Sequence, residues 1–246
     1  ISYVSPQSTK YWKALAICIA LGSNPGGHDG VGPLSDNLSY NGDRVGTAVV
    51  VSAGNESNLG HHFHGEIDLR PNHRIMEISV APDDPGFFLE IWGNAPNTYS
   101  IDILSPTGEY IPRIPARLRE NREISFIFER TVIDVDYIIV DSSSGDQLIL
   151  VRFYAPTEGI WRIRVYGSGG LNMSFHAWLP TAPFVNSQTR FVTPSPDITI
   201  TAPGSAIVPI TTTSYNYATN SIELGASRGY TSFGIVKPEL AAPGVN

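Results

Sequence analysis

Short runs of alternating apolar and polar residues fill the middle of the chain. In one of them Tyr99, Ile101 and Ile103 alternate with polar neighbours. Because successive side chains of a strand point to opposite faces, this alternation predicts strands with one buried face. Eight such runs predict an antiparallel β-sandwich of the jelly-roll type: residues 73–80, 86–92, 99–103, 124–128, 135–141, 147–154, 161–165 and 171–178.

The pattern changes on either side of this middle region. Residues 13–21 and 45–51 are continuous apolar runs, which are typical of strands buried on both faces of a parallel sheet. Between them, residues 33–44 have the apolar spacing of a helix. A further apolar run at residues 206–210 predicts another buried strand, with Pro209 near its end. Strand, helix and strand in this order predict a βαβ unit.

Together these patterns predict a partial α/β parallel-sheet core that is interrupted by an all-β antiparallel jelly-roll sandwich. We expect the core to comprise residues 1–65 and 201–246, and the inserted sandwich to comprise residues 66–200. Such an insertion is tolerated because the two ends of an inserted module lie close together.

Composition narrows the class of protein. The 246 residues are 41% hydrophobic and 16% charged, with a formal net charge of −7, so the chain is globular and acidic. It has no Lys/Arg cluster and no apolar run long enough to cross a bilayer, so we expect neither a nucleic-acid nor a membrane partner. Cys18 is the one cysteine, and we interpret it as an inert, buried hydrophobe. Because both ends of the sequence look cut, we interpret it as a piece of a longer chain.

Several side chains could in principle hold a ligand. His61, His62 and His64 lie close together, but no cysteine or carboxylate stands near them at metal-ligand spacing. Acidic residues in the middle region form no calcium-loop pattern, so structural calcium is not indicated and we expect no metal and no cofactor: Asp83, Asp84, Asp134, Asp136 and Asp141. The tryptophans of the middle region offer either a sugar-stacking platform or core packing, and the alternation around Trp161 favours packing.

One polar residue stands where α/β sheets bind ligands. The apolar run at residues 45–51 ends in Gly54-Asn55-Glu56, which puts an asparagine amide at the carboxyl end of the predicted strand. Such an amide can donate an N–H to the oxyanion that develops during acyl transfer. The alternative is an ordinary turn, for which Gly-Asn is also a common dipeptide.

The residues around Asn55 resemble those of the subtilases, the subtilisin-like serine peptidases. Residues 49–56 match the family's strand and oxyanion-asparagine motif. Residues 20–22 match its substrate-binding strand, with Ala20 in place of the usual serine. Residues 230–234 and 237–245 resemble the segment that precedes the nucleophile motif.

Finer detail is similar to a subgroup of that family. Residues 26–30 and 60–62 resemble clostridial-type subtilases, some of which act in spore germination and carry a jelly-roll insertion inside the protease domain. The resemblance therefore implies a subtilisin-like fold for the flanking residues, with the sandwich as the insertion. It implies an extracellular or spore-associated bacterial protein.

The resemblance implies one catalytic residue in this chain, Asn55, as the oxyanion-hole donor of a serine endopeptidase. The family's catalytic Asp, His and Ser are expected outside the chain, so this chain alone should be inactive. Two short stretches are implied to bind the substrate. The backbone of Ala20, Leu21 and Gly22 is implied to pair with an extended peptide, and the small residues Ser52, Ala53 and Gly54 to line an open pocket for bulky side chains.

Other functions stay open at this point. One alternative is a catalytically dead pseudoprotease that acts as a sensor or scaffold, and another is a β-sandwich module that binds carbohydrate or cell wall. For the peptidase we expect two partners, a peptide or protein substrate and the remainder of the parent chain. A homo-oligomer is a further alternative, because a second copy could replace missing strands.

Overall fold

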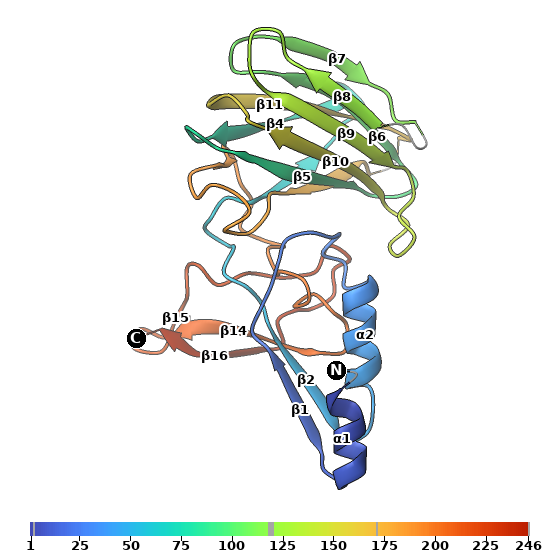
Figure 1. The fold of residues 1–246 in the computed structure, drawn as a ribbon, viewed down its shortest axis with the longest axis vertical. Helices are drawn as coiled ribbons and strands as arrows, with labels where there is room; N and C mark the ends of the chain where they lie inside the picture. The colour runs from blue at the N-terminus through green and yellow to red at the C-terminus, as the bar shows by residue number, and fades with distance from the viewer. Residues whose placement is uncertain (2, 118–120, 171, 246) are drawn as a thin grey trace. The chain divides into compact units, whose positions relative to one another are not determined.

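A computed structural model describes residues 1, 3–117, 121–170 and 172–245 of the chain. Their contacts divide the chain into two compact units. Unit 1 comprises Ile1–Asn58 and Pro196–Asn246, and unit 2 comprises Leu59–Ser195. The chain therefore leaves unit 1 after Asn58 and returns to it at Pro196 (Figure 1).

Unit 2 consists of two antiparallel sheets. The first has the strand order β3-β12-β5-β10-β9-β8 and the second β13-β4-β11-β6-β7 (Figure 1). The strands are β3 His62–Glu66, β4 His73–Val80, β5 Gly86–Gly93, β6 Thr98–Leu104, β7 Tyr110–Ile114, β8 Asn121–Ser125, β9 Val132–Ile138, β10 Gln147–Tyr154, β11 Gly159–Ser168, β12 Ser174–Trp178 and β13 Arg190–Phe191.

The core of unit 2 lies between these sheets. Alternate residues of each strand point inward, as they do along β11, where Trp161, Ile163 and Val165 are fully buried. The Trp161 ring meets the edges of Phe126 and Phe153 at centroid distances of 5.2 Å and 5.4 Å. Trp161 is thus a core residue, as its alternation predicted, and the large apolar cluster around it belongs wholly to unit 2.

Unit 1 contains a smaller sheet and two short helices. Its strands β1, β2, β14 and β15 lie in this order, and β16 pairs with β14. The pairs β1–β2, β2–β14 and β14–β16 are parallel, and the pair β14–β15 is antiparallel. The elements are α1 Val4–Tyr11, β1 Leu15–Ile19, α2 Pro33–Gly42, β2 Thr47–Ser52, β14 Ile210–Asn216, β15 Ser221–Ile222 and β16 Leu240–Val245.

The expectation of an α/β parallel-sheet core is wrong. Strands dominate the regular structure of the described chain, with 41% of its residues in strands and 8% in helices, and most of its sheet structure is antiparallel. A parallel α/β sheet needs helices that bury both of its faces. Here α1 contributes no buried residue and β1 has none, because Leu15, Ile17 and Ile19 are only half-buried. The continuous apolar run at residues 13–21 therefore did not indicate a strand that is buried on both faces.

The predicted elements match the observed ones unevenly. The strands expected at residues 73–80 and 147–154 are confirmed to the residue, and the helix expected at residues 33–44 is confirmed as α2. Residues 206–209 do not form a strand. They follow a turn that the Ala206 N–H closes by donating to Pro203 O at 2.9 Å, and β14 begins only at Ile210. Cys18 was expected to be buried but is exposed, because its side of β1 is not covered.

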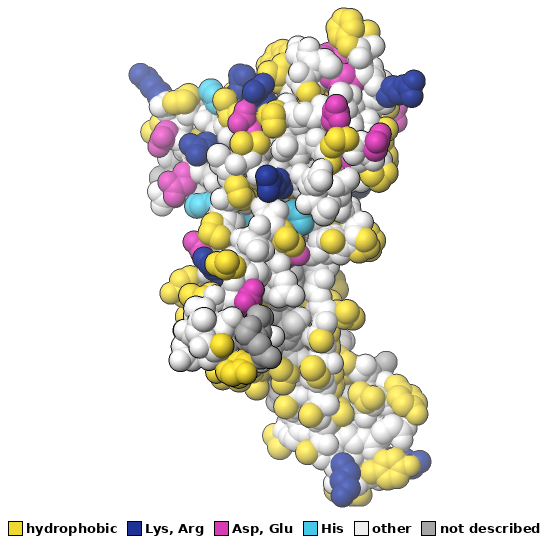
Figure 2. Space-filling view, turned by 90° about the vertical axis from the view of Figure 1, so that its left-hand side faces the viewer, with side chains coloured by type: hydrophobic (Ala, Val, Ile, Leu, Met, Phe, Trp, Pro, Cys, Tyr) yellow, Lys and Arg dark blue, Asp and Glu magenta, His cyan; other side chains and the backbone are white. Residues whose placement is uncertain are grey.

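The surface and the helices add two observations. On the face shown in Figure 2, positive and negative side chains of the described residues are interspersed rather than gathered by sign.

Among the described residues, neither helix is long and apolar enough to cross a membrane.

Candidate functional site

Two parallel strands of unit 1 end side by side, and the predicted site residues follow them directly. Ile19, the last residue of β1, pairs with Val51 in β2, so Ala20 lies at the level of Ser52, the last residue of β2. The Ser52 hydroxyl reaches Leu21 O at 3.5 Å. The structure therefore brings the two predicted substrate-binding stretches together where β1 and β2 end.

Asn55 stands at the tip of the turn that follows β2. It is exposed, whereas Ala53 before it and Glu56 after it are buried. Gly54 has φ +101°, a conformation that side-chain-bearing residues rarely adopt, and this reverses the chain just before Asn55. The Asn55 side chain is therefore exposed to solvent, while the residues that anchor its turn, Ala53 and Glu56, are buried.

Ser227 holds this turn in place from a distant part of the sequence. Its N–H donates to Gly54 O at 2.9 Å, and its Oγ accepts the Glu56 N–H at 2.9 Å. Ser227 is buried and brackets Asn55 on both sides. Sequence reasoning missed this residue because no strand pattern, helix pattern or motif marks the sequence around it.

Thr201 contacts both of the stretches that were predicted to bind substrate. Its N–H donates to Ala53 O at 2.9 Å, and its Oγ1 donates to the same oxygen at 3.2 Å. A methyl group added to Gly22 would overlap the Thr201 side chain, and one added to Gly54 would come within 2.7 Å of it. Thr201 therefore lies between the two glycines, and the sequence contained no signal that pointed to it.

His28 ties the loop after β1 to the segment that carries Thr201. Its Nδ1 lies 2.6 Å from Ile200 O, and its Nε2 lies 2.8 Å from Asn24 O. Burial lowers the pKa of His28 to about 4, although the two backbone hydrogen bonds and the nearby Glu56 carboxylate act to raise it. The ring is thus neutral at pH 7 and carries a single N–H.

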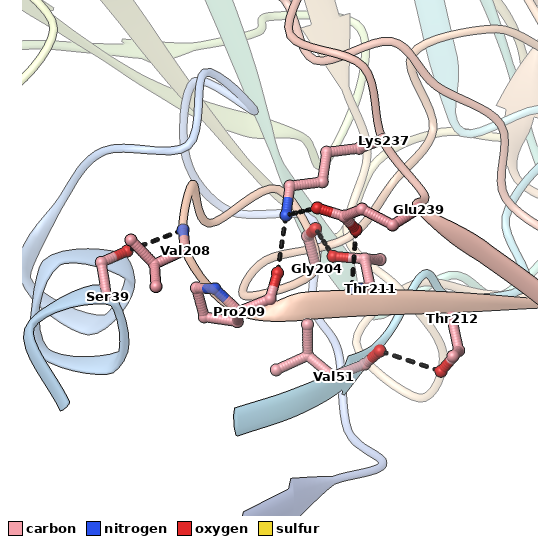
Figure 3. Close-up of polar contacts among 9 residues, drawn as sticks. All are labelled: Ser39, Val51, Gly204, Val208, Pro209, Thr211, Thr212, Lys237 and Glu239. Atoms are coloured by element: carbon pink, nitrogen blue, oxygen red, sulfur yellow. Dashed lines mark hydrogen bonds and ion pairs between the residues drawn. The ribbon is translucent and has the colours of Figure 1, made fainter. Parts of the chain in front are cut away.

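A network of polar contacts around Lys237 lies at the start of β14 (Figure 3). The Lys237 ammonium is almost fully buried and donates to Pro209 O at 2.6 Å and to the Glu239 carboxylate. The other oxygen of Glu239 accepts the Thr211 N–H at 2.8 Å, and Thr211 Oγ1 donates to Gly204 O at 2.6 Å. This network, the Lys237 network, joins the start of β14 to the start of β16.

The histidines considered as metal ligands pack in unit 2. The His62 and His176 rings are joined by a 3.0 Å Nε2–Nδ1 contact, and the rings of His64 and His176 stack at 4.5 Å. Among the described residues, no group of three His, Cys, Asp or Glu side chains is arranged to hold a metal ion.

Four of the five acidic residues considered for calcium have structural partners, and the fifth, Asp83, is exposed. Asp84 accepts the Thr189 hydroxyl at 2.6 Å, and Asp141 accepts the Ser143 N–H at 2.8 Å. Asp134 accepts the Tyr154 hydroxyl at 3.2 Å, and Asp136 pairs with Arg152. These carboxylates thus cap turns and join strands.

The tryptophans considered as a sugar platform do not form one. Trp161 and Trp178 are buried, and Trp92 donates its indole N–H to Glu90 at 2.9 Å. Stacking on a sugar requires exposed ring faces, so these residues give no support to carbohydrate binding.

Comparison with known proteins gives one informative likeness. No protein-family model matches the chain, and no curated protein matches it. Among solved structures, the chain is similar to the CspB protease of Clostridium perfringens, with a TM-score of 0.89 and 26% sequence identity. The match covers 99% of this chain and 50% of that one, so the chain spans half the length of that protease. The chain therefore shares its fold with part of a clostridial protease, which relates it to peptidases.

Proposed function

We propose that this chain is part of a subtilisin-like serine endopeptidase, to which it contributes the oxyanion-hole asparagine and the peptide-binding strand. The observation that carries the proposal is that the exposed Asn55 follows β2, whose end lies beside the end of β1, in a fold similar to that of a clostridial protease. The sequence motifs around Asn55 support the same family.

Each residue of the site has a chemical task in this proposal. The full-length protein supplies a serine that attacks the scissile carbonyl and a histidine that transfers the proton. The Asn55 side-chain N–H donates to the oxyanion of the tetrahedral intermediate, a type of contact that contributes about 2.7–4 kcal/mol to transition-state stabilisation. The backbone of Ala20, Leu21 and Gly22 pairs with the extended peptide as an added strand.

The hydrogen bonds that fix the Asn55 turn support its proposed role as an oxyanion donor. An oxyanion donor is effective when its position is fixed before the reaction, since no free energy is then lost in reorganisation. Ser227 hydrogen bonds on both sides of Asn55 supply that rigidity. The proposal further assigns the protein a peptide or protein substrate, no cofactor, and an extracellular or spore-associated location.

Fluorophosphonate labelling of the full-length protein tests the proposal. We expect covalent labelling of one serine, and a labelling rate that falls about 10²–10³-fold in Asn55→Ala, the loss typical of an oxyanion donor. Asn58→Ala is the matched control, because Asn58 is also an exposed asparagine close to the same turn. Its labelling rate should equal that of the unmodified protein.

Two results would contradict the proposal in different ways. If the mature full-length protein is not labelled at all, it is a pseudoprotease with the same fold. If labelling is normal and equally fast in Asn55→Ala, the protein is a serine hydrolase whose oxyanion site lies elsewhere.

A further inference from the structure

We infer that Thr201 closes the bottom of the pocket for the substrate side chain just before the scissile bond, so that the site selects peptides with a small residue there, such as Gly, Ala or Ser. This inference rests on the proposed function and specifies its substrate class. It replaces the open pocket that the small residues Ser52, Ala53 and Gly54 had implied.

The two peptide-binding stretches form the walls of this pocket. Ala20–Gly22 continue β1, and Ser52–Gly54 continue β2, which is its parallel neighbour. A side chain that enters between the walls moves toward the two glycines, since they offer the least steric hindrance. The Ser52 hydroxyl, 3.5 Å from Leu21 O, already narrows the gap between the walls.

Thr201 occupies the space that these glycines leave. A Cβ at Gly54 would lie 2.7 Å from both Thr201 Cγ2 and Thr201 Oγ1, and a Cβ at Gly22 would overlap the same side chain. Thr201 is 2% exposed, so both of its branches are packed. The glycines therefore make room for Thr201 and leave none for a bulky side chain of the substrate.

Thr201 is also prevented from moving aside. Its hydroxyl and its N–H both donate to Ala53 O, so a rotation of the side chain would break the hydroxyl bond. The neighbouring Ala202 forms two backbone hydrogen bonds with Ser23, at 2.8 Å and 3.0 Å. On the other side, Ile200 O lies 2.6 Å from Nδ1 of the buried His28 ring. The pocket floor is thus fixed from three directions.

Cleavage of two matched peptides by the full-length protein tests the inference. The peptides differ only in Ala or Phe before the scissile bond. We expect kcat/KM to be at least tenfold higher for the Ala peptide. Thr201→Gly should remove the floor and raise kcat/KM for the Phe peptide at least tenfold, with the change mainly in KM.

A second variant separates the size of the residue from its chemistry. Thr201→Val keeps the shape and removes the hydroxyl, so the preference for the Ala peptide should remain. If the unmodified protein cleaves the Phe peptide as well as the Ala peptide, or if Thr201→Gly leaves the ratio unchanged, the inference is wrong although the peptidase function stands.

Binding measurements keep the inference testable if no cleavage occurs. Isothermal titration calorimetry with the same two peptides then measures the pocket without catalysis. Tighter binding of the Ala peptide, reversed in Thr201→Gly, supports the small pocket in a protein that is not an active peptidase. Equal binding of both peptides, or binding of neither, overturns the inference.

Discussion

His28 is buried between the loop after β1 and the segment that carries Thr201, so a change in its protonation affects the stability of both. Both ring nitrogens face backbone carbonyl oxygens, one on Asn24 and the other on Ile200. These oxygens are hydrogen-bond acceptors only, so they attract the proton, but burial is the larger influence and lowers the pKa to about 4. The neutral ring is therefore built into the native state.

This burial predicts acid sensitivity. The pKa of His28 is about 4 in the folded chain and 6.5 in an exposed histidine. Stability from the neutral ring is therefore fully present above pH 6.5 and is lost as the pH falls toward 4, by about 3 kcal/mol in total. Urea unfolding at pH 7 and pH 4.5 should show that loss, and His28→Gln should be less sensitive to pH by a similar amount.

The exposed His64 provides the control for this prediction. His64→Gln should keep the pH dependence of the unmodified chain, because the His64 side chain is exposed in the folded chain, whereas His28 is buried. An unchanged pH dependence in His28→Gln would mean that other groups cause the acid sensitivity.

Single residues of the site differed in how far the sequence could predict them. Asn55 was recognisable because the strand before it and the turn around it are contiguous in sequence. Thr201 was not, because it lies 148 residues from Ala53, to which it is hydrogen-bonded. A contact of that kind depends on the path of the intervening chain, and a local pattern holds no information on it.

At the scale of strands and helices, alternation was a reliable guide where one face meets a core and the other meets solvent. This holds for β4 and β10, whose bounds agree with the prediction. It fails for β14, Ile210–Asn216, which is rich in Thr and has no apolar stripe. Hydrogen bonds from Thr211 and Thr212 side chains hold that strand instead (Figure 3). Helix α1 was missed for a similar reason, since it buries no side chain.

The Lys237 network leads to a prediction about β14 and β16. Lys237→Met keeps the length of the side chain but removes the donor to Pro209 O and the partner of Glu239. We expect a loss of about 1–3 kcal/mol in the free energy of unfolding, because a buried carbonyl and a carboxylate lose their partner. Thermal or urea unfolding measures it.

Lys10→Met is the matched control, because Lys10 is an exposed lysine of the same unit. Its effect should stay within about 0.5 kcal/mol, as is usual for surface changes. Equal effects of the two substitutions would show that the Lys237 network contributes no net stability.

At the scale of the whole molecule, the two units differ in how much core each contains. The large apolar cluster lies entirely within unit 2, whereas the unit 1 cluster has three buried members among the described residues, Leu38, Val49 and Val51. The ends of unit 2 are also joined, since the Phe191 N–H donates to Gly60 O and the Ser195 N–H donates to His62 O, both at 2.9 Å.

We therefore expect residues 59–195 to fold when expressed alone. The fragment should unfold cooperatively and give a dispersed amide NMR spectrum, because its core needs no residue from unit 1. Trp161→Ala in the same fragment should cost about 3–5 kcal/mol, since it empties the centre of the core. A fragment without cooperative unfolding would mean that unit 2 depends on unit 1.

The joined ends of unit 2 also bear on the order in which the chain folds. In an unfolded chain, the contact of Ala53 with Thr201 closes a loop of 148 residues. Once the sandwich has formed, the Ser195–His62 hydrogen bond ties its ends together and the loop is effectively about 15 residues long, which lowers the entropic cost of closure by about 2 kcal/mol. The ribosome also releases Asn55 well before Thr201, with the whole sandwich between them. Folding of the sandwich thus turns a long-range contact into a local one, and the candidate site assembles last.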